Sequence, residues 1–287
     1  MMSARWLPVA ASGSTRSSDM LDAVLVVLPT LGRRMESLRD ALESVAAQRA
    51  EVNLRLVVVL PVVATEARSL AVTFGADLVD DPKRGLAAAM NAGVAARAGE
   101  TFYVGLGDDD LLRPHGIKTL IGLASRRENT VVAYGACDYI DGESRVIGTN
   151  RVGKLASIVL AWGPNLIPHP GALINLEALE KVGGFAEDRP YTMDLDAFLR
   201  LKRIGRFVST RESVSAFRWH ADSLTVADRK TSAREALDVK RNNLTGPARG
   251  ISLIWLWPIA LATLAAGEIV SWRARRLSRE SHTGAAG

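Results

Sequence analysis

Apolar runs alternate with segments of helical periodicity along the first 106 residues, and this alternation constrains the fold more than any other feature of the chain. The predicted elements follow one another as strand 23–28, helix 35–48, strand 54–60, helix 65–74, strand 77–79, helix 85–97 and strand 101–106. The strands 23–28 and 54–60 are largely continuous apolar runs, which is typical of strands buried on both faces. Strands that alternate with helices predict an α/β fold with a mostly parallel sheet flanked by helices.

The pattern is less regular in the second half of the chain. We expect helix 114–126, strand 130–134, a turn at 141–142, a proline-containing loop at 162–170, helices 176–182 and 194–203, and short strands 207–209 and 214–219. The segment 251–267 carries no charge and contains Pro258, so it differs from everything before it. It predicts a C-terminal apolar helical segment.

Length and composition bound the possible classes of protein. With 287 residues, of which 48% are hydrophobic and 23% charged, the chain can bury one substantial core. The net charge of +5 favours anionic partners, and nucleic acid, phosphorylated substrates and acidic lipid headgroups all fit it. The single cysteine, Cys137, excludes an internal disulfide and a cysteine-based zinc site, which is compatible with a reducing compartment. The apolar run 6–11 is too short for a signal peptide.

Three adjacent acids, Asp108, Asp109 and Asp110, directly follow the predicted strand 101–106. They therefore lie at the carboxyl end of a strand, where open α/β sheets bind their ligands. Neighbouring carboxylates repel one another unless a cation offsets them, and a divalent cation with oxygen ligands is the economical explanation. A diphosphate would complete its coordination. The alternative is an acidic surface turn in which Asp110 caps the next helix.

Basic residues are expected at the same edge of the sheet. The loop 29–34 contains Arg33 and Arg34, and the pair Lys83-Arg84 precedes a helix. A helix start with adjoining cations favours phosphate through exposed N–H groups and the helix dipole. The alternative is that these are ordinary solvated charges in turns.

A second group of polar residues lies near the end of the predicted domain. Asp194 and Asp196 begin an amphipathic helix, where the helix dipole alone favours acids, but either could act as a general base towards an acceptor hydroxyl. Arg218 and His220 end a strand-like run, and they suit a departing diphosphate or a metal.

Taken together, these residues resemble the family 2 glycosyltransferases over roughly 24–225. The motifs that carry the resemblance are 24–30, 42–48, 85–93, the acidic run 108–110, 169–172, 182–185, 194–201 and 217–220. None of these motifs is specific alone, but their order and spacing are. Gly107 departs from the pattern, because many members carry Asp there, and Met193 stands where most members have Glu.

The resemblance implies a GT-A fold with a Rossmann-like sheet, and inverting transfer of a hexosyl or deoxyhexosyl group. The sugar would pass from a nucleoside-diphosphate sugar to an acceptor hydroxyl of a lipid-linked or cell-envelope glycan, with Mn²⁺ or Mg²⁺ as cofactor and no nucleic-acid partner. The implied roles are catalytic base for Asp194; metal ligands for Asp109, Asp110 and His220; nucleotide-sugar contacts for Pro29, Thr30, Arg34, Arg84, Asn91, Asp108 and Arg218; and acceptor-side contacts for His169 and Asp196.

We expect three regions: a flexible tail at 1–20, a glycosyltransferase domain at 21–228 with a nucleotide-sugar half (21–115) and an acceptor half (116–228), and a C-terminal helical segment at 229–287. Trp255, Trp257 and Trp272 favour a membrane interface, whereas Pro258 and the short apolar length make a full crossing marginal. The sequence thus predicts a cytoplasmic protein attached to the inner face of the cell membrane. The alternative is a helical hairpin that packs on the domain or in a dimer contact.

Two other functions fit parts of the pattern. A non-catalytic nucleotide-sugar or glycan-binding module could keep this fold, as Gly107 suggests. A nucleotidyltransferase is disfavoured because no Gly-rich phosphate loop with a Lys follows the first strand.

Overall fold

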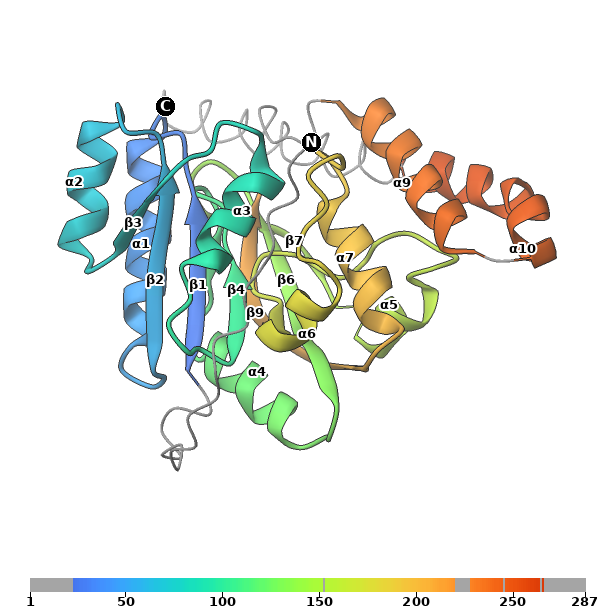
Figure 1. Ribbon diagram of the computed structural model, residues 1–287, viewed down its shortest axis with the longest axis horizontal. Coiled ribbons are helices and arrows are strands. Elements are labelled where there is room, and N and C mark those ends of the chain that lie inside the picture. The colour runs from blue at the N-terminus through green and yellow to red at the C-terminus, as the bar shows by residue number, and fades with distance from the viewer. Residues whose placement is uncertain (1–22, 152, 220–227, 245, 264, 266–287) are drawn as a thin grey trace, which may run out of the picture.

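In the computed structural model, residues 23–151, 153–219, 228–244, 246–263 and 265 are described. The first half is a parallel α/β unit (Figure 1). Its elements are β1 (Val24–Pro29), α1 (Met35–Gln48), β2 (Leu54–Leu60), α2 (Thr65–Thr73), β3 (Asp77–Asp80), α3 (Leu86–Ala95) and β4 (Phe102–Gly105). The strands pair in parallel in the order β3-β2-β1-β4, which confirms the predicted alternation of strands and helices.

The second half extends the same sheet with mixed strand directions. Its elements are β5 (Leu111–Leu112), α4 (Gly116–Ser125), β6 (Thr130–Ile140), β7 (Val146–Asn150), α5 (Lys154–Val159), β8 (Leu173–Asn175), α6 (Leu176–Lys181), α7 (Met193–Lys202) and β9 (Arg206–Arg218). The strand order is β3-β2-β1-β4-β8-β6-β9-β5, with β7 paired to β6. Strand β8 runs antiparallel to both β4 and β6, whereas β6 and β9 are parallel.

Two hydrophobic clusters fill the two faces of the sheet. Alternate residues of β1 point in opposite directions, so Val24, Val26 and Leu28 join one cluster while Leu25 and Val27 join the other. The first cluster is closed by helices α1, α2 and α4, and the second by α3, α6 and α7. The first five side chains of β1, Val24 to Leu28, are fully buried, which explains the continuous apolar run in the sequence.

Some predicted elements of the second half are wrong. The predicted strands 207–209 and 214–219 are one strand, β9, whose pairing with β6 shifts register between them. The predicted strand 130–134 continues to Ile140 and contains Cys137, which is buried. Strands β7 and β8 and helix α5 were not predicted, because they are short and their apolar pattern is weak.

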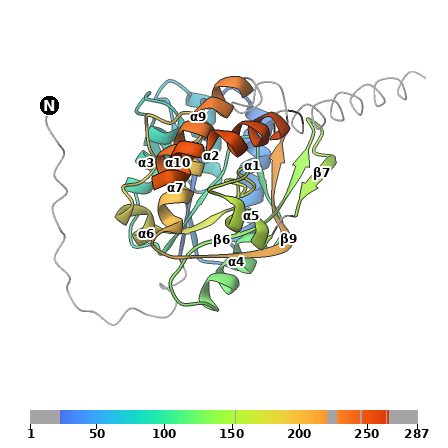
Figure 2. The same cartoon turned by 90° about the vertical axis from the view of Figure 1, so that its right-hand side faces the viewer.

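After β9 the chain is helical. Helices α9 (Arg229–Asn243) and α10 (Gly246–Ile251) are followed by a helical segment at 253–263, and all of them lie at one end of the molecule, in front in Figure 2. Helix α9 contacts α7. Among the described residues, no helix combines the length and apolar character that a membrane crossing requires.

Candidate active site

The loop after β1 and the turn after β4 meet because these parallel strands are neighbours and their carboxyl ends lie at one edge of the sheet. The Thr30 hydroxyl donates a hydrogen bond to Asp108 Oδ2 at 2.6 Å. The Arg34 guanidinium donates to the other oxygen, Asp108 Oδ1, also at 2.6 Å. The Thr30 hydroxyl oxygen in turn accepts from the N–H of Gly32, whose φ of 70° lies in the region that favours glycine. Thr30, Arg34 and Asp108 are thus brought together as predicted.

Arg34 also reaches the second acid of the run. Its NH1 lies 3.2 Å from Asp109 Oδ2, so one guanidinium bridges Asp108 and Asp109. Although burial opposes its charge, the neighbouring carboxylates, Asp108 first, raise the pKa of Arg34 above its usual value. The Arg34 side chain is 40% exposed, so a ligand can reach this ion pair.

Carboxylate oxygens of Asp109 and Asp110 lie close to Gly107. A Cβ atom at Gly107 would lie 2.7 Å from Asp110 Oδ2 and 3.0 Å from Asp109 Oδ1, so both carboxylates lie against the backbone at this glycine. Burial, and then the charge of Asp109, raise the pKa of Asp110 well above its usual value. Mg²⁺ and Mn²⁺ sites of this kind need only one or two carboxylates when phosphates complete the coordination.

Two neighbouring carboxylates of this kind fit a divalent cation that is held jointly with a diphosphate. No cluster of three or more His, Cys, Asp or Glu side chains arranged to hold a metal occurs among the described residues. His220, the third predicted metal ligand, lies outside the described residues.

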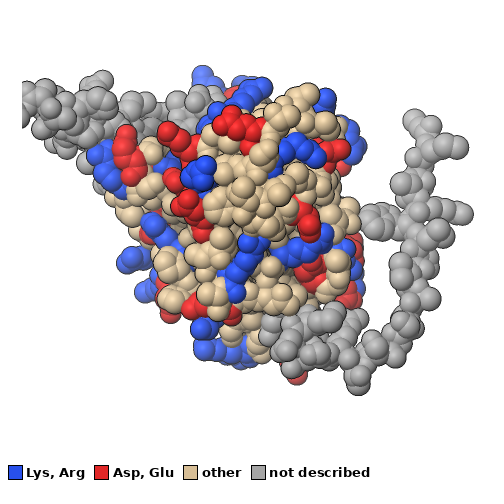
Figure 3. Space-filling view, turned by 90° about the vertical axis from the view of Figure 1, so that its left-hand side faces the viewer, with Lys and Arg blue, Asp and Glu red and all other residues tan. Residues whose placement is uncertain are grey.

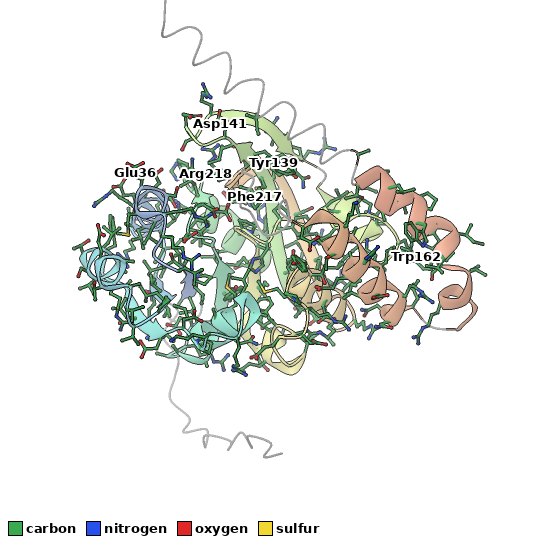
Figure 4. All side chains as sticks on the ribbon, turned by 90° about the horizontal axis from the view of Figure 1, so that it is seen from above. Glu36, Tyr139, Asp141, Trp162, Phe217 and Arg218 are labelled. Atoms are coloured by element: carbon green, nitrogen blue, oxygen red, sulfur yellow. The ribbon has the colours of Figure 1, made fainter. Side chains whose placement is uncertain are left out.

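Arg218 contacts the acidic turn, residues 107–110, through its backbone and its side chain. Its side chain is only 5% exposed, and it donates from Nε to the Asp109 carbonyl and from NH1 to the carbonyls of Asp141 and Gly142. Its backbone N–H donates to Asp110 Oδ1, and its NH2 lies 3.4 Å from Asp40 of α1. Figure 4 shows Arg218 beside Asp141, near the first turn of α1. Arg218 thus contacts the turn through its backbone and side chain, and its predicted contact with phosphate stays a prediction.

Asp194 lies in the first turn of α7, and Asn165 Nδ2 donates to its Oδ2 at 3.1 Å. Burial raises the pKa of Asp194 above its usual value, an effect that the nearby His169 and the hydrogen bond from Asn165 partly offset. Burial also lowers the pKa of His169, so its imidazole is neutral at neutral pH. A partly accessible carboxylate with a raised pKa suits a general base.

His169 connects Asp194 and its partner Asn165, here called the Asp194 group, to the acidic turn at residues 107–110. Its ring lies against Gly105, where a Cβ atom would approach His169 Cε1 to 2.6 Å, and Gly105 ends β4 three residues before Asp108. The rings of Tyr103 and Phe185 enclose the imidazole, with centroids 6.3 and 5.7 Å away. The predicted base and the predicted cation site therefore lie at the carboxyl end of the same strand.

Three other predicted site residues are engaged in structural contacts. Asn91 of α3 exchanges two hydrogen bonds with the backbone of Phe185. Asp196 pairs with Arg200 one turn later at 2.6 Å, and Arg84 pairs with Glu187 at 2.9 Å. The last predicted residue, Pro29, ends β1 directly before Thr30. The predicted roles of Asn91, Asp196 and Arg84 stay predictions.

The structure also adds Asn165 and Tyr139, which the sequence did not single out. Asn165 lies in a loop without periodicity, so only its contact with Asp194 marks it. Tyr139, Phe217 and Trp219 pack edge to face beside Arg218, with ring centroids 5.5 to 6.4 Å apart (Figure 4). Their residue types are common in cores, and β6 and β9 bring them together only in the folded sheet.

Surface charge does not suggest a nucleic-acid groove on the face that carries α2. Figure 3 shows Lys and Arg interspersed with Asp and Glu over this face. Several of these charges form ion pairs, such as Arg55 with Asp77 and Arg68 with Asp80. A surface of mixed sign does not attract a polyanion strongly.

Comparison with known proteins agrees with this arrangement. The model of glycosyl transferase family 2 matches residues 25–183. An uncharacterized glycosyltransferase of Rickettsia prowazekii (strain Madrid E) is 25% identical over 197 residues, which cover 66% of this chain and 61% of that protein. The chain thus spans about three-fifths of the length of this relative.

Solved structures show the same fold. TarS of S. aureus in complex with UDP-GlcNAc has a TM-score of 0.62 and 12% identity, covering 80% of this chain and 70% of that chain. The mannosyltransferase PcManGT of Pyrobaculum calidifontis, in complex with GDP-Man and Mn²⁺, has a TM-score of 0.60 and 20% identity, covering 92% and 79%. These similarities confirm the predicted GT-A fold. Since the family model spans more than half of the chain, this protein belongs to glycosyl transferase family 2.

Proposed function

We propose that this protein is an inverting glycosyltransferase that moves a hexosyl or deoxyhexosyl group from a nucleoside-diphosphate sugar to an acceptor hydroxyl. The observation that supports the proposal is the contact of His169, which interacts with Asp194, with Gly105 at the end of β4, three residues before Asp108. Family membership supports the same conclusion, as do the nucleotide sugars bound by similar structures, UDP-GlcNAc in TarS and GDP-Man in the mannosyltransferase.

Asp194 acts as the general base in this mechanism. It takes the proton of the acceptor hydroxyl while the hydroxyl oxygen attacks the anomeric carbon of the donor. The bond from that carbon to the diphosphate breaks, and the nucleoside diphosphate leaves with the electron pair, so the configuration inverts. A well-placed base of this kind contributes about 10² to 10⁴-fold to the rate. Asn165 holds the carboxylate in position.

The acidic turn and Arg34 receive the donor. Asp109 and Asp110 would hold Mn²⁺ or Mg²⁺, which when bound neutralises charge on the departing diphosphate. The mannosyltransferase structure with Mn²⁺ supports this choice of cation. Thr30 and Arg34 fix the Asp108 carboxylate from either side, so it is oriented before the donor arrives.

We further propose that the C-terminal helices attach the protein to the inner face of the cell membrane, where a lipid-linked or cell-envelope acceptor would lie. Apolar side chains of these helices face solvent, with Ile254 75% exposed and Trp257 50% exposed. Trp162, which follows α5 and is labelled in Figure 4, packs on Trp255 with ring centroids 5.3 Å apart, and Ile158 of α5 is 69% exposed. Exposed Trp and Ile side chains of this kind favour the interfacial region of a bilayer.

The transfer proposal is tested with a panel of UDP-, GDP- and dTDP-sugars in the presence of Mn²⁺. We expect at least one donor to raise the melting temperature and to release its nucleoside diphosphate, because a ligand of the folded state stabilises it. Binding without release would identify a non-catalytic module, and release of pyrophosphate would identify a nucleotidyltransferase.

The membrane proposal is tested by co-sedimentation with vesicles of phosphatidylglycerol and phosphatidylethanolamine. The full chain should sediment with the vesicles, and a chain ending at Arg249 should not. Equal behaviour of the two proteins would refute this part of the proposal.

A further inference from the structure

Helix α9 contacts the segment that leads into the proposed base. The Glu235 carboxylate accepts two hydrogen bonds at Oε1, one from the Tyr191 N–H at 3.1 Å and one from the Thr192 hydroxyl at 2.6 Å. Thr192 is 5% exposed and occupies the position before the first residue of α7. A threonine there ordinarily caps its own helix, but this hydroxyl makes no such bond and is directed to Glu235 instead.

Helix α9 also contacts the loop that carries Asn165, the hydrogen-bond partner of Asp194. Lys240 is 6% exposed and donates a hydrogen bond from Nζ to the carbonyl of Gly163. Gly163 lies two residues before Asn165, whose amide donates to Asp194 Oδ2. Burial of Lys240 lowers its pKa to about 8.

We propose that α9 is a positioning element for the catalytic base, with Glu235 fixing the start of α7 and Lys240 fixing the loop that carries Asn165. This inference rests on the proposed transfer activity. Both chain segments that define the Asp194 carboxylate, the helix start and the amide partner, are thereby held by one helix. Both α7 and α9 lie outside residues 25–183, which the family model matches.

The positioning role predicts a specific kinetic pattern. A base displaced by a fraction of an ångström or given freedom to rotate lowers kcat, while the donor site at the acidic turn is unaffected. Glu235→Ala should therefore lower kcat at least tenfold and change the donor dissociation constant less than twofold. Glu235→Gln keeps an oxygen acceptor for Thr192 and Tyr191, and its kcat should stay within threefold of the wild-type value.

The experiment measures nucleoside diphosphate release from the panel of nucleotide sugars with Mn²⁺, and donor affinity by calorimetry, on the full chain. Thr192→Val removes only the hydroxyl, so it should reproduce part of the loss, and its combination with Glu235→Ala should cost no more than Glu235→Ala alone. Lys240→Met should also lower kcat with donor affinity unchanged. Asp238→Ala, an exposed acid on the same helix, is the matched control and should behave like the wild type.

Three outcomes would overturn the inference. The first is a folded Glu235→Ala protein with wild-type kcat, and the second is a donor affinity that falls in parallel with kcat. The third applies if Glu235→Ala does not fold: a wild-type kcat in both single variants, Thr192→Val and Lys240→Met, would then overturn the inference. Failure of the proposed function is distinguishable, because the wild-type protein itself would then release no nucleoside diphosphate.

Discussion

Arg218→Met distinguishes a residue that holds the acidic turn from one that binds phosphate. Met has a similar length and fills the buried channel, but it removes the donors to the carbonyls of Asp109, Asp141 and Gly142. A hydrogen bond that involves a charged group contributes about 1.5 to 3 kcal/mol. Because Met restores packing and water can reach some of these carbonyls, we expect a net loss of about 3 to 5 kcal/mol in the free energy of unfolding.

Urea unfolding measures this loss. With an m-value of about 3 kcal/mol per molar urea, the midpoint should fall by about 1 to 1.7 M at unchanged m. Arg211→Met, on the same strand but exposed, should change the free energy of unfolding by no more than about 0.5 kcal/mol. If Arg218→Met unfolds like the wild type and instead loses affinity for a nucleoside diphosphate, then Arg218 contacts phosphate and the structural role given to it here is wrong.

Asp194→Asn should lower transfer by at least about 10²-fold while calorimetry shows donor affinity within twofold of wild type, because only the base is lost; a parallel loss of affinity would contradict this division of roles. The raised pKa of Asp194 gives a second prediction. Because the base must be unprotonated, kcat should fall as pH decreases through a pKa above the ordinary value of 3.8. A plot of kcat against pH whose acidic limb lies at or below that value would refute this prediction. In the absence of nucleotide, Arg34→Ala should bind Mn²⁺ more tightly than the wild type, because the guanidinium competes with the cation for Asp108 and Asp109. Loss of the free Mn²⁺ signal in electron paramagnetic resonance measures this binding. Unchanged Mn²⁺ affinity would show that Arg34 does not occupy the cation's place.

The departure at Gly107 has a physical explanation in the structure. Where many members of the family carry an acid, this chain has a glycine, and the carboxylates of Asp109 and Asp110 lie against it. A Cβ atom at this position would approach Asp110 Oδ2 to 2.7 Å, so another residue there would displace that carboxylate. The acidic character of the site is therefore supplied by the residues that follow Gly107.

Sequence periodicity determined the parallel half of the fold and the place of its ligands. The elements from β1 to β4 are local, each is recognisable from residues close in sequence, and parallel pairing places Thr30 and Asp108 at one edge. Asp194 at the start of α7 was predicted for the same reason, since an amphipathic helix and its first turn are local features.

Contacts between residues far apart in the sequence were decided only by the tertiary structure. The three-residue strand β8 has its place because β4 and β6 pair with it on either side. The guanidinium of Arg218 donates to carbonyls that lie 76 to 109 residues away in the sequence. No local sequence pattern predicts these contacts. The support that α9 gives to the Asp194 segments is of the same kind. In the sequence Glu235 and Lys240 are ordinary polar residues, and only the fold pairs Glu235 with Thr192 and buries Lys240 against Gly163.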